Sequence, residues 1–456
     1  MKNYDVIIIG GGPSGIITGV TGKKQNPEKS FLMIKGEEKE LVPCGIPYVF
    51  HELDDISQNA MGPKSFIDAG GELLIDYVRK IDIKNKILST EKGLDFQFDK
   101  LVFATGSVPV IPTFIEGYNL EGVEYILKKY DYIETLKAKT DKAKNIVVIG
   151  GGFIGVEVAE QLAKHSAKHS DKEVSLIEME KFCLYYAFSE DVAARADKAI
   201  RNTNINLYTN KKVEKILGEK NQVRAVLLDD GTEIKADLII ASIGYKPNSS
   251  LARHCGLRLN DNGAIDVDRY MRTGIKDIFA VGDCSAAIGF ITGRTDSVML
   301  ASTATAEARI LGYNLYHINL LRNFQGTIAI FSTEINNVAF ASAGAIEQTA
   351  HNENIHYIVG KFEDVDRHPG TLPGTSKLFV KLIVSPKNGS IIGGEICGGK
   401  STGELINTIG LAIQKSVTVY ELISFQIGTH PLLTSAPTKY VLIKAAENAI
   451  AKMNTI

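Results

Sequence analysis

The sequence predicts an α/β protein with two Rossmann-like nucleotide-binding domains followed by a C-terminal α+β domain. Two observations indicate the first part: an apolar stretch runs straight into a glycine-rich turn at residues 4–16, YDVIIIGGGPSGI, and again at residues 145–157, NIVVIGGGFIGVE. A third observation is that the glycine-rich turns stop near residue 323. The segments that follow show the apolar–polar alternation of strands, and one of them shows the apolar spacing of a helix. A length of 456 residues accommodates two or three domains.

The glycine spacing gives each turn a physical purpose. The first copy has Gly10, Gly12 and Gly15, and the second has Gly150, Gly152 and Gly155. One glycine allows the tight strand-to-helix turn, one lets backbone N–H groups approach a pyrophosphate, and one allows the helix to pack closely on the strand. The positive end of the helix dipole then faces the phosphates. One such turn could be purely structural, but two copies, each after a strand and before a helix, predict two dinucleotide sites.

An acidic residue is expected at the end of the next strand, where it accepts hydrogen bonds from a ribose. In the second unit VSLIEME, residues 174–180, supplies Glu178, whose carboxylate would repel the extra phosphate of NADP and favours NADH. In the first unit the strand FLMIKGEE, residues 31–38, carries Lys35 near that place. Glu37 or Glu38 can substitute, and Glu37 is the predicted ligand.

Further turns indicate that the two sites take different cofactors. In TGIKDIFAVGDC, residues 273–284, a strand ends at Gly282 and Asp283, where a carboxylate can bind a ribityl hydroxyl of flavin. Two more strands run into small-residue turns, as expected for connections between two nucleotide domains. These turns contain Ala104, Thr105 and Gly106 in the first case and Gly244 in the second.

With these motifs in view, the sequence resembles the flavin-dependent pyridine nucleotide-disulfide oxidoreductases over nearly its whole length. It is most similar to the single-cysteine branch, which contains NADH oxidases, NADH peroxidases, coenzyme A disulfide reductases and persulfide reductases. The resemblance implies an FAD-binding domain of residues 1–115 and 255–322, an NAD-binding domain of residues 116–254, and a C-terminal interface domain of residues 323–456. It also implies a homodimer in which the partner's C-terminal domain completes each active site.

Cys44, in LVPCGIPYVF, is the predicted redox-active residue. Relatives with two cysteines carry CxxxxC, but here Val49 stands five residues after Cys44 and Lys39 five before it. The oxidant must therefore come from outside, and Cys44 can cycle through a mixed disulfide or a sulfenic acid. A helix start at this cysteine would stabilise its thiolate. The alternative is a buried, inert cysteine.

The resemblance implies roles for three more residues. Phe153 stands where relatives place an aromatic gate over the nicotinamide pocket, and Glu157 matches the glutamate that holds the nicotinamide amide. His430, in IGTHPLLTSAP, resembles the histidine that acts as a general base across the dimer. Each of the three also has a structural explanation: packing, a solvated helix charge and a loop histidine.

Three departures from the family pattern limit these inferences. The glutamate that normally orients the His-Pro histidine is absent, with Ala436 and Pro437 nearby. The tyrosine of coenzyme A disulfide reductases is replaced in the Leu432-Leu433 region. Pro13 stands where peroxidases of this branch have a histidine, which disfavours peroxide reduction.

The sequence accordingly predicts an FAD enzyme that passes electrons from NADH to Cys44 and on to a small disulfide or persulfide, with coenzyme A derivatives as the best candidates. One alternative is an NADH oxidase that reduces oxygen with Cys44 as a sulfenate. Another is a flavoprotein without turnover, acting as an electron carrier or redox sensor. Two intact dinucleotide motifs disfavour this last alternative.

Composition favours a small-molecule partner over nucleic acid or a membrane. Lys plus Arg number 51 and Asp plus Glu 53, and these charges are dispersed along the chain. No apolar run reaches the ~18 residues of a membrane span, so a cytoplasmic location is expected. The five cysteines include no CxxC pair. This pattern predicts reduced thiols, no disulfide framework and no metal site.

Overall fold

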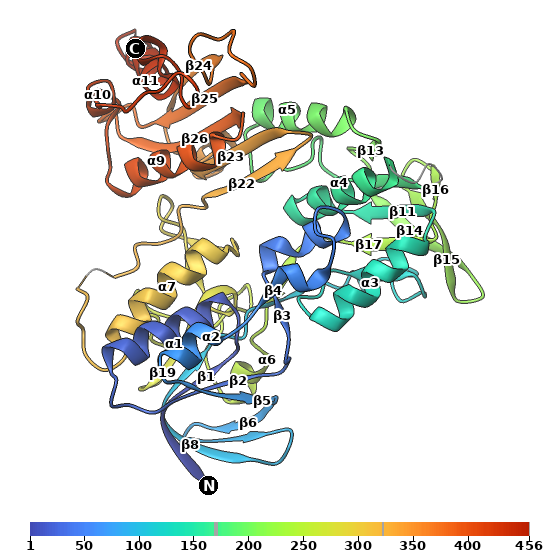
Figure 1. Ribbon diagram of the computed structural model, residues 1–456, viewed down its shortest axis with the longest axis vertical. Coiled ribbons are helices and arrows are strands. Elements are labelled where there is room, and N and C mark those ends of the chain that lie inside the picture. Colours follow the sequence, from blue (N-terminus) through green and yellow to red (C-terminus); the bar gives the residue numbers. More distant parts are fainter. Residues whose placement is uncertain (168–171, 322, 456) are drawn as a thin grey trace.

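The computed structural model describes residues 1–167, 172–321 and 323–455. Figure 1 shows three parts, and the lower part contains both the blue N-terminal segment and the yellow segment that includes α7 (Ala301–Asn314). The inserted green part lies to the right, and the orange and red C-terminal part lies at the top. The predicted fold class is confirmed: two α/β units with parallel strands at their centres are followed by an α+β module.

The first unit is a seven-stranded sheet of order β5-β2-β1-β8-β7-β6, with β19 paired to β8. Its strands are β1 (Lys2–Ile9), β2 (Phe31–Lys35), β5 (Glu72–Ile75), β6 (Val78–Asp82), β7 (Ile87–Thr90), β8 (Asp95–Phe103) and β19 (Ile278–Ala280). Strand β1 is buried on both faces, because Val6 packs in one cluster with Leu311 of α7 (Ala301–Asn314) while Ile7 packs in another with Leu257. Such double burial explains its continuous apolar run.

The second unit is a parallel five-stranded sheet of order β10-β17-β11-β12-β13. Its strands are β10 (Val123–Tyr125), β11 (Asn145–Ile149), β12 (Glu173–Ile177), β13 (Ile205–Tyr208) and β17 (Leu238–Ala241), and its helices are α3 (Tyr130–Lys142), α4 (Phe153–Ala167) and α5 (Glu190–Arg201). A small antiparallel sheet adjoins it, made of β14 (Val213–Glu219), β15 (Gln222–Leu228) and β16 (Glu233–Lys235).

The C-terminal module is an antiparallel sheet of order β22-β23-β26-β25-β24. Its elements are β22 (Phe331–Ile335), β23 (Val338–Gly344), α8 (Glu347–Asn352), β24 (Ile358–Val365), β25 (Lys377–Val384), β26 (Ile391–Gly398), α9 (Thr402–Gln414), α10 (Val419–Leu422) and α11 (Val441–Met453). The sequence predicts a strand already at GTIAIFST, residues 326–333, but β22 begins later. Ala329 interrupts the extended backbone with a positive φ of 46°.

A buried ion cluster joins the C-terminal module to the second unit. Lys381 of β25 is fully buried, and its ammonium pairs with Asp191 of α5, with Glu347, and with Glu395 at 3.3 Å. The Glu395 carboxylate in turn accepts a hydrogen bond of 2.6 Å from the backbone N–H of Ser189. Removing one partner of a buried ion pair costs on the order of 3–5 kcal/mol. The contacts of Lys381 with Asp191 and of Glu395 with Ser189 cross between the two parts and hold them together.

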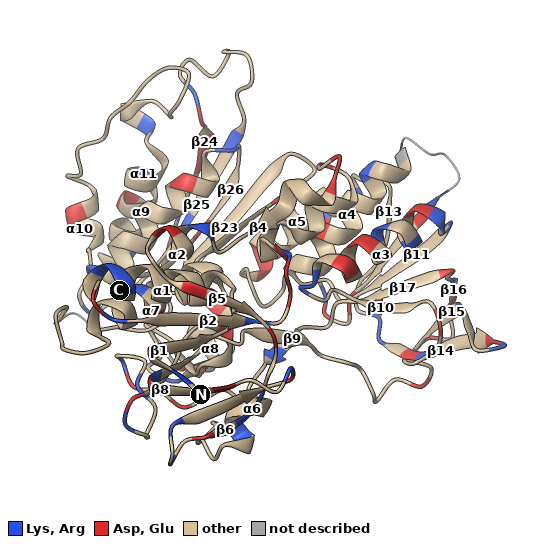
Figure 2. Cartoon of the chain, turned by 60° about the horizontal axis from the view of Figure 1, so that its bottom comes forward, with Lys and Arg blue, Asp and Glu red and all other residues tan. Residues whose placement is uncertain are grey.

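Shorter elements complete the fold. They are α1 (Pro13–Gln25), β3 (Glu40–Leu41), the 3₁₀ helix η1 (Pro43–Phe50), η2 (Ile56–Asn59), β4 (Ala60–Met61), α2 (Lys64–Asp68), β9 (Ser107–Pro109), β18 (Tyr245–Pro247), α6 (Ser250–His254), η3 (Gly282–Cys284), β20 (Ala287–Ile288), β21 (Thr295–Asp296) and η4 (Pro437–Lys439). Within the described residues, no helix has the length and apolarity needed to cross a membrane. Figure 2 shows acidic and basic residues interspersed over all three parts.

Candidate functional site

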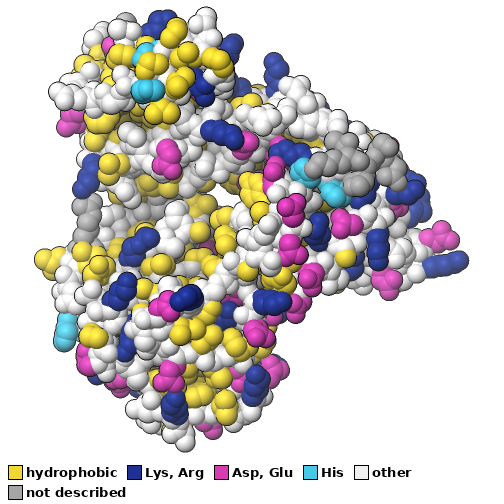
Figure 3. Space-filling model, viewed as in Figure 1, with side chains coloured by type: hydrophobic (Ala, Val, Ile, Leu, Met, Phe, Trp, Pro, Cys, Tyr) yellow, Lys and Arg dark blue, Asp and Glu magenta, His cyan; other side chains and the backbone are white. Residues whose placement is uncertain are grey.

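A cavity of about 1490 Å³ lies where the two α/β units meet. In Figure 3 a hollow edged by apolar side chains opens between the three parts of the molecule. Most of the sequence-predicted site residues line this cavity: Gly10, Gly12, Glu37, Cys44, Ala104, Thr105, Gly106, Gly150, Gly152, Phe153, Glu157, Glu178, Gly244 and Asp283. The fold therefore brings these residues together from segments up to 273 positions apart, counting from residue 10 to residue 283.

The first glycine turn is a cradle that a side chain would fill. Gly10 has a φ of +114°, and a Cβ atom there would lie 2.1 Å from the carbonyl oxygen of Ala104. A Cβ atom at Gly15 would lie 2.1 Å from the carbonyl oxygen of Gly10, because α1 packs directly on β1. Beside Gly12 the space is open for 4 Å. Gly15 thus stands behind the turn while Gly12 faces the cavity, as phosphate binding requires.

The second turn repeats this geometry. Gly150 has a φ of +106°, and a Cβ atom at Gly155 would lie 1.8 Å from the Gly150 carbonyl oxygen. The space beside Gly152 is again open. Glu178 follows β12 directly, and its Oε2 accepts a 2.6 Å hydrogen bond from the backbone N–H of Gly151. The carboxylate is therefore held beside the turn.

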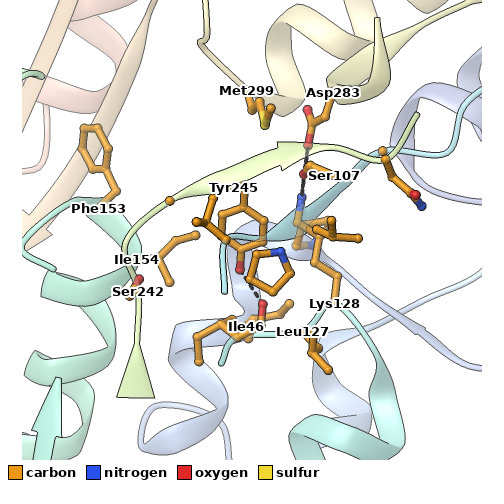
Figure 4. Close-up of a pocket in the computed structure, with 18 of the residues that line it drawn as sticks. Ile46, Ser107, Leu127, Lys128, Phe153, Ile154, Ser242, Tyr245, Asp283 and Met299 are labelled. Carbon is orange, nitrogen blue, oxygen red and sulfur yellow. Dashed lines mark hydrogen bonds and ion pairs between the residues drawn. The ribbon is translucent and has the colours of Figure 1, made fainter. Parts of the chain in front are cut away.

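A polar cluster that sequence patterns did not reveal surrounds Asp283. Its Oδ2 accepts hydrogen bonds from Ser107 at 2.7 Å and from Lys128 at 3.0 Å. Figure 4 shows this chain of contacts at one end of the cavity, with Tyr245 beside it. The Lys128 ammonium lies 4.9 Å from the ring centroid of Tyr245. Lys128 belongs to the lysine-containing stretch ILKKYDYIE, in which nothing distinguishes it from a solvated charge.

Cys44 lies in η1 with its side chain exposed to the cavity. The sequence predicts that a helix start depresses its pKa, and the structure corrects this expectation. Burial by the cavity walls raises the pKa of the Cys44 thiol, and the Glu157 carboxylate raises it further, whereas Lys128 lowers it. The short 3₁₀ helix contains Pro43 and Pro47, which have no N–H groups to offer a thiolate.

The other cysteines lie elsewhere. Cys183, Cys284 and Cys397 are buried, and Cys255 is half-buried. None of the four lines the large cavity. Burial raises the pKa of each of these thiols, so Cys44 is the one cysteine among the described residues that faces this cavity.

Phe153 and Glu157, both on α4, form the wall on the side of the C-terminal module. The Phe153 ring meets the ring of Phe331 at 4.8 Å between centroids. Glu157 accepts a 2.8 Å hydrogen bond from the Thr333 hydroxyl. Burial raises the pKa of the Glu157 carboxyl to about 7, and this hydrogen bond opposes the shift. Its protonation state therefore changes near neutral pH.

Glu37 lines the cavity, but its carboxylate already has partners. Tyr77 donates a hydrogen bond of 2.5 Å to it, and the Lys129 ammonium lies 2.8 Å away. Glu38 is exposed, and the nearby Glu40 also lines the cavity. Gly282 lies behind Asp283 and donates its backbone N–H to buried Glu307 at 2.8 Å.

His430 is not brought to Cys44 within the described chain. It lies in an exposed loop of the C-terminal module, outside the large cavity. This loop is held by His368, whose backbone N–H donates to the Pro431 carbonyl at 3.1 Å and whose Nδ1 lies 2.9 Å from the Thr434 carbonyl. Leu433, in the same loop, is 70% exposed. A role for His430 at this site requires a second subunit.

The described residues contain no group of three or more His, Cys, Asp or Glu side chains that could hold a metal ion. The arrangement instead combines two phosphate cradles, a carboxylate beside the second turn, and one thiol between them. The space beside Gly12 and Gly152 is open, and a side chain at either position would fill it. This open space fits the pyrophosphate of a dinucleotide.

Comparison with known proteins agrees with this geometry. Residues 4–308 match the family model described as pyridine nucleotide-disulphide oxidoreductase, and residues 330–441 match the dimerisation domain of that family.

An NADH oxidase of Methanocaldococcus jannaschii is 30% identical, with 98% of this chain and 99% of that protein covered. An NAD(P)H coenzyme A polysulfide/persulfide reductase of Pyrococcus horikoshii is also 30% identical, over 86% of this chain and 87% of that protein. Among solved structures, an NAD-dependent persulfide reductase of A. fulgidus superposes with a TM-score of 0.90 at 27% identity, covering 99% of this chain and 84% of that chain.

Proposed function

Because this chain belongs to the pyridine nucleotide-disulphide oxidoreductase family, we propose that it reduces a small disulfide or persulfide, such as a coenzyme A derivative, through Cys44. It is an NAD(P)H oxidoreductase that uses FAD. The observation that carries the proposal is the position of Cys44, the one cysteine in the described chain that faces the cavity between the two glycine turns. The similarity to an NAD(P)H coenzyme A polysulfide/persulfide reductase and to a CoA-dependent NAD(P)H sulfur oxidoreductase, both of Pyrococcus species, supports a coenzyme A derivative as the substrate.

Each cofactor has a separate set of candidate ligands. The turn at Gly10 and Gly12 would hold the FAD pyrophosphate, Asp283 its ribityl chain, and Ala104–Gly106 its ring system. The turn at Gly150 and Gly152 would hold NADH, with Glu178 accepting from its ribose. When bound, the flavin takes a hydride from NADH and delivers electrons singly or in pairs to a second acceptor.

We assign residues 1–115 and 255–322 to the FAD-binding domain, 116–254 to the NAD-binding domain and 323–456 to the interface domain. The pairing of β19 with β8 supports the discontinuous first domain, because it adds a strand from residues 278–280 to the N-terminal sheet.

The proposed chemistry of Cys44 balances without a second protein thiol. Its thiolate attacks the coenzyme A sulfur of a persulfide, forming a mixed disulfide and expelling hydrosulfide. One NADH then supplies the hydride equivalent that splits the mixed disulfide into coenzyme A thiol and Cys44 thiolate. Lys128 contributes positive charge near Cys44 and favours the thiolate. With coenzyme A disulfide, the leaving group of the first step is a coenzyme A thiolate.

Oxygen is the competing acceptor, and the similarity to NADH oxidases favours it as the second candidate. In that reaction one NADH and a proton would reduce oxygen to hydrogen peroxide. The Cys44 thiolate would then attack the peroxide, giving a sulfenic acid and releasing hydroxide, and a second NADH would return the sulfenic acid to the thiolate with loss of water. Pro13 leaves no histidine at the start of α1 for peroxide chemistry.

NADH is the proposed electron donor rather than NADPH. The Glu178 carboxylate is fixed beside the second turn by its hydrogen bonds from the backbone N–H groups of Gly151 and Glu180, at 2.6 and 2.8 Å. A fixed negative charge there repels a 2′-phosphate.

The raised pKa of Glu157 leads us to expect that NADH binding depends on pH. Above a pH of about 7 its carboxylate is ionised and accepts from the nicotinamide amide; below it, the protonated form accepts less well. We expect the KM for NADH to rise by about tenfold in total as the pH falls through the Glu157 pKa, because a hydrogen bond to a charged acceptor is replaced by one to a neutral acceptor. Steady-state kinetics of wild type and Glu157→Gln check this: the variant should show a flat profile. A wild-type KM that stays constant across neutrality contradicts the role.

We also propose a homodimer in which His430 serves the partner's Cys44. The match to the dimerisation domain supports a dimer, and so do the exposed apolar residues of this module, which include Phe425, Leu432 and Leu433. A histidine there would protonate the leaving thiolate.

Subunit mixing tests this arrangement. Dimers of Cys44→Ser and dimers of His430→Ala should each be weakly active, whereas the mixed dimer retains one site with both residues. We expect co-expression with two affinity tags to recover about half of wild-type turnover in the doubly tagged dimer, since only one of its two symmetric sites is intact. Recovery of no activity would place His430 outside the partner's site.

A further inference from the structure

We propose that Glu40, held by buried Lys35, accepts hydrogen bonds from the adenosine ribose of FAD. Glu40 lies beyond the end of β2, where such a carboxylate usually stands. The proposal rests on the proposed use of the large cavity by FAD and is independent of the electron acceptor.

The two halves of the molecule define equivalent positions. In the first sheet Ile9 pairs with Ile34 across β1 and β2, and the backbone N–H of Gly10 donates to the Ile34 carbonyl at 2.8 Å. In the second sheet Ile149 pairs with Ile177, and Gly150 donates to the Ile177 carbonyl at 2.8 Å. The residue after Ile177 is Glu178, so its counterpart in the first unit is the residue after Ile34.

That counterpart is Lys35, which cannot accept a hydrogen bond from a ribose. Its side chain is only 1% exposed, and its ammonium lies 3.1 Å from Oε2 of Glu40. Strand β3, which pairs with β4 through Glu40 and Met61, brings the carboxylate back to the turn. The lysine therefore replaces the acid at the strand end and anchors another acid in its place.

The carboxylates of the two halves occupy matching places. A Cβ atom on the middle glycine of the first turn, Gly11, would lie 2.9 Å from Oε2 of Glu40. A Cβ atom on the middle glycine of the second turn, Gly151, would lie 2.9 Å from Oε2 of Glu178. Each carboxylate thus stands over the equivalent glycine, although one comes from the strand end and the other from five residues beyond it (40 minus 35).

Glu40 also has unused hydrogen-bonding capacity. Its buried Oε2 faces the Lys35 ammonium at 3.1 Å and accepts no other hydrogen bond from the described residues, while the side chain remains 16% exposed. Glu37, by contrast, is already bonded to Tyr77 and Lys129. A carboxylate with a single cationic partner and a partly exposed side chain keeps lone pairs that can accept from the hydroxyl groups of a ribose beside the turn.

The acids of one loop provide a matched series of variants. We expect Glu40→Gln to weaken FAD binding by about tenfold to a hundredfold, since a hydrogen bond to a charged acceptor is lost. Glu38→Gln, at an exposed position of the same loop, should bind FAD as wild type does. Dissociation constants come from the fluorescence of FAD released from the full-length holoenzyme. If Glu37→Gln weakens FAD binding and Glu40→Gln does not, Glu37 is the ligand and the proposal is overturned.

A ligand-based measurement separates a ribose contact from a folding effect. ADP and 2′,3′-dideoxy-ADP are titrated against bound FAD in wild type and in Glu40→Gln. ADP should compete better than the dideoxy analogue in wild type, and the two should be equivalent in the variant. Equal competition in wild type overturns the proposal, as does an equal loss for both competitors in the variant. These measurements contain no NADH or acceptor, so their failure is distinct from a failure of the Cys44 chemistry.

Discussion

Replacement of Cys44 by Ser is expected to lower anaerobic NADH consumption with coenzyme A persulfide or coenzyme A disulfide by about three orders of magnitude. A serine hydroxyl cannot form the mixed disulfide, and loss of a covalent nucleophile removes most of the rate enhancement of such reactions. The flavin content should be unchanged, because Cys44 does not belong to the glycine turns that would hold the cofactor. Steady-state absorbance of NADH measures the rate, and protein-bound flavin absorbance measures the content.

Cys255→Ser is the matched control, since Cys255 is half-buried and lies outside the cavity. It should retain wild-type rates with every acceptor. The same assay with coenzyme A persulfide, coenzyme A disulfide, polysulfide and oxygen ranks the acceptors of the wild-type enzyme. Full activity of Cys44→Ser toward all of them would falsify the thiol mechanism, and fast aerobic turnover alone would identify an oxidase.

Substitution of the buried glycine behind each turn should impair the binding of one cofactor and leave the binding of the other unchanged. Gly15→Ala places a methyl group 2.1 Å from a backbone oxygen, and Gly155→Ala places one 1.8 Å from the equivalent oxygen. No side-chain rotation relieves either contact, so the helix must move away from its turn. We expect Gly15→Ala to purify largely without flavin. Gly155→Ala should keep its flavin but raise the KM for NADH on the order of a hundredfold.

Flavin-to-protein absorbance ratios and NADH titrations check both outcomes. Gly403→Ala, on α9 in the C-terminal module, is the control, because no atom lies within 4 Å of its added Cβ atom. It should match wild type in both measurements. Loss of flavin from Gly155→Ala together with normal flavin in Gly15→Ala would reverse the assignment of the two sites.

Much of the fold follows from local sequence patterns. Strands β1 and β11 end in continuous apolar runs that lead directly into glycines, and both features are visible within a dozen residues. The end of β12 at Ile177 likewise places Glu178 beside its turn, where the sequence predicts a ribose ligand. Such features are readable because the residues that determine them are neighbours in the chain.

Other parts of the site depend on contacts between distant segments. The pairing of Lys128 with Asp283 joins residues 155 positions apart, and no local pattern indicates it. The position of Glu40 depends on the return of β3 to the turn. The direction of the Cys44 pKa shift also escapes local reasoning, because it depends on the cavity walls and on Glu157, 113 residues away (157 minus 44).

The buried ion cluster at Lys381 restricts how substrates can reach the site. Hinge opening between α5 and β25 would separate Lys381 from Asp191 and remove the Ser189 N–H from the buried Glu395 carboxylate, which makes a domain swing along this seam costly. The nicotinamide must then reach the part of the cavity beside Phe153 through rotation of aromatic side chains rather than through separation of the domains. Such rotations occur far faster than hinge motions, which take microseconds to milliseconds. Entry of the nicotinamide should therefore be a rapid equilibrium, and the slow steps of turnover should lie in sulfur chemistry or product release.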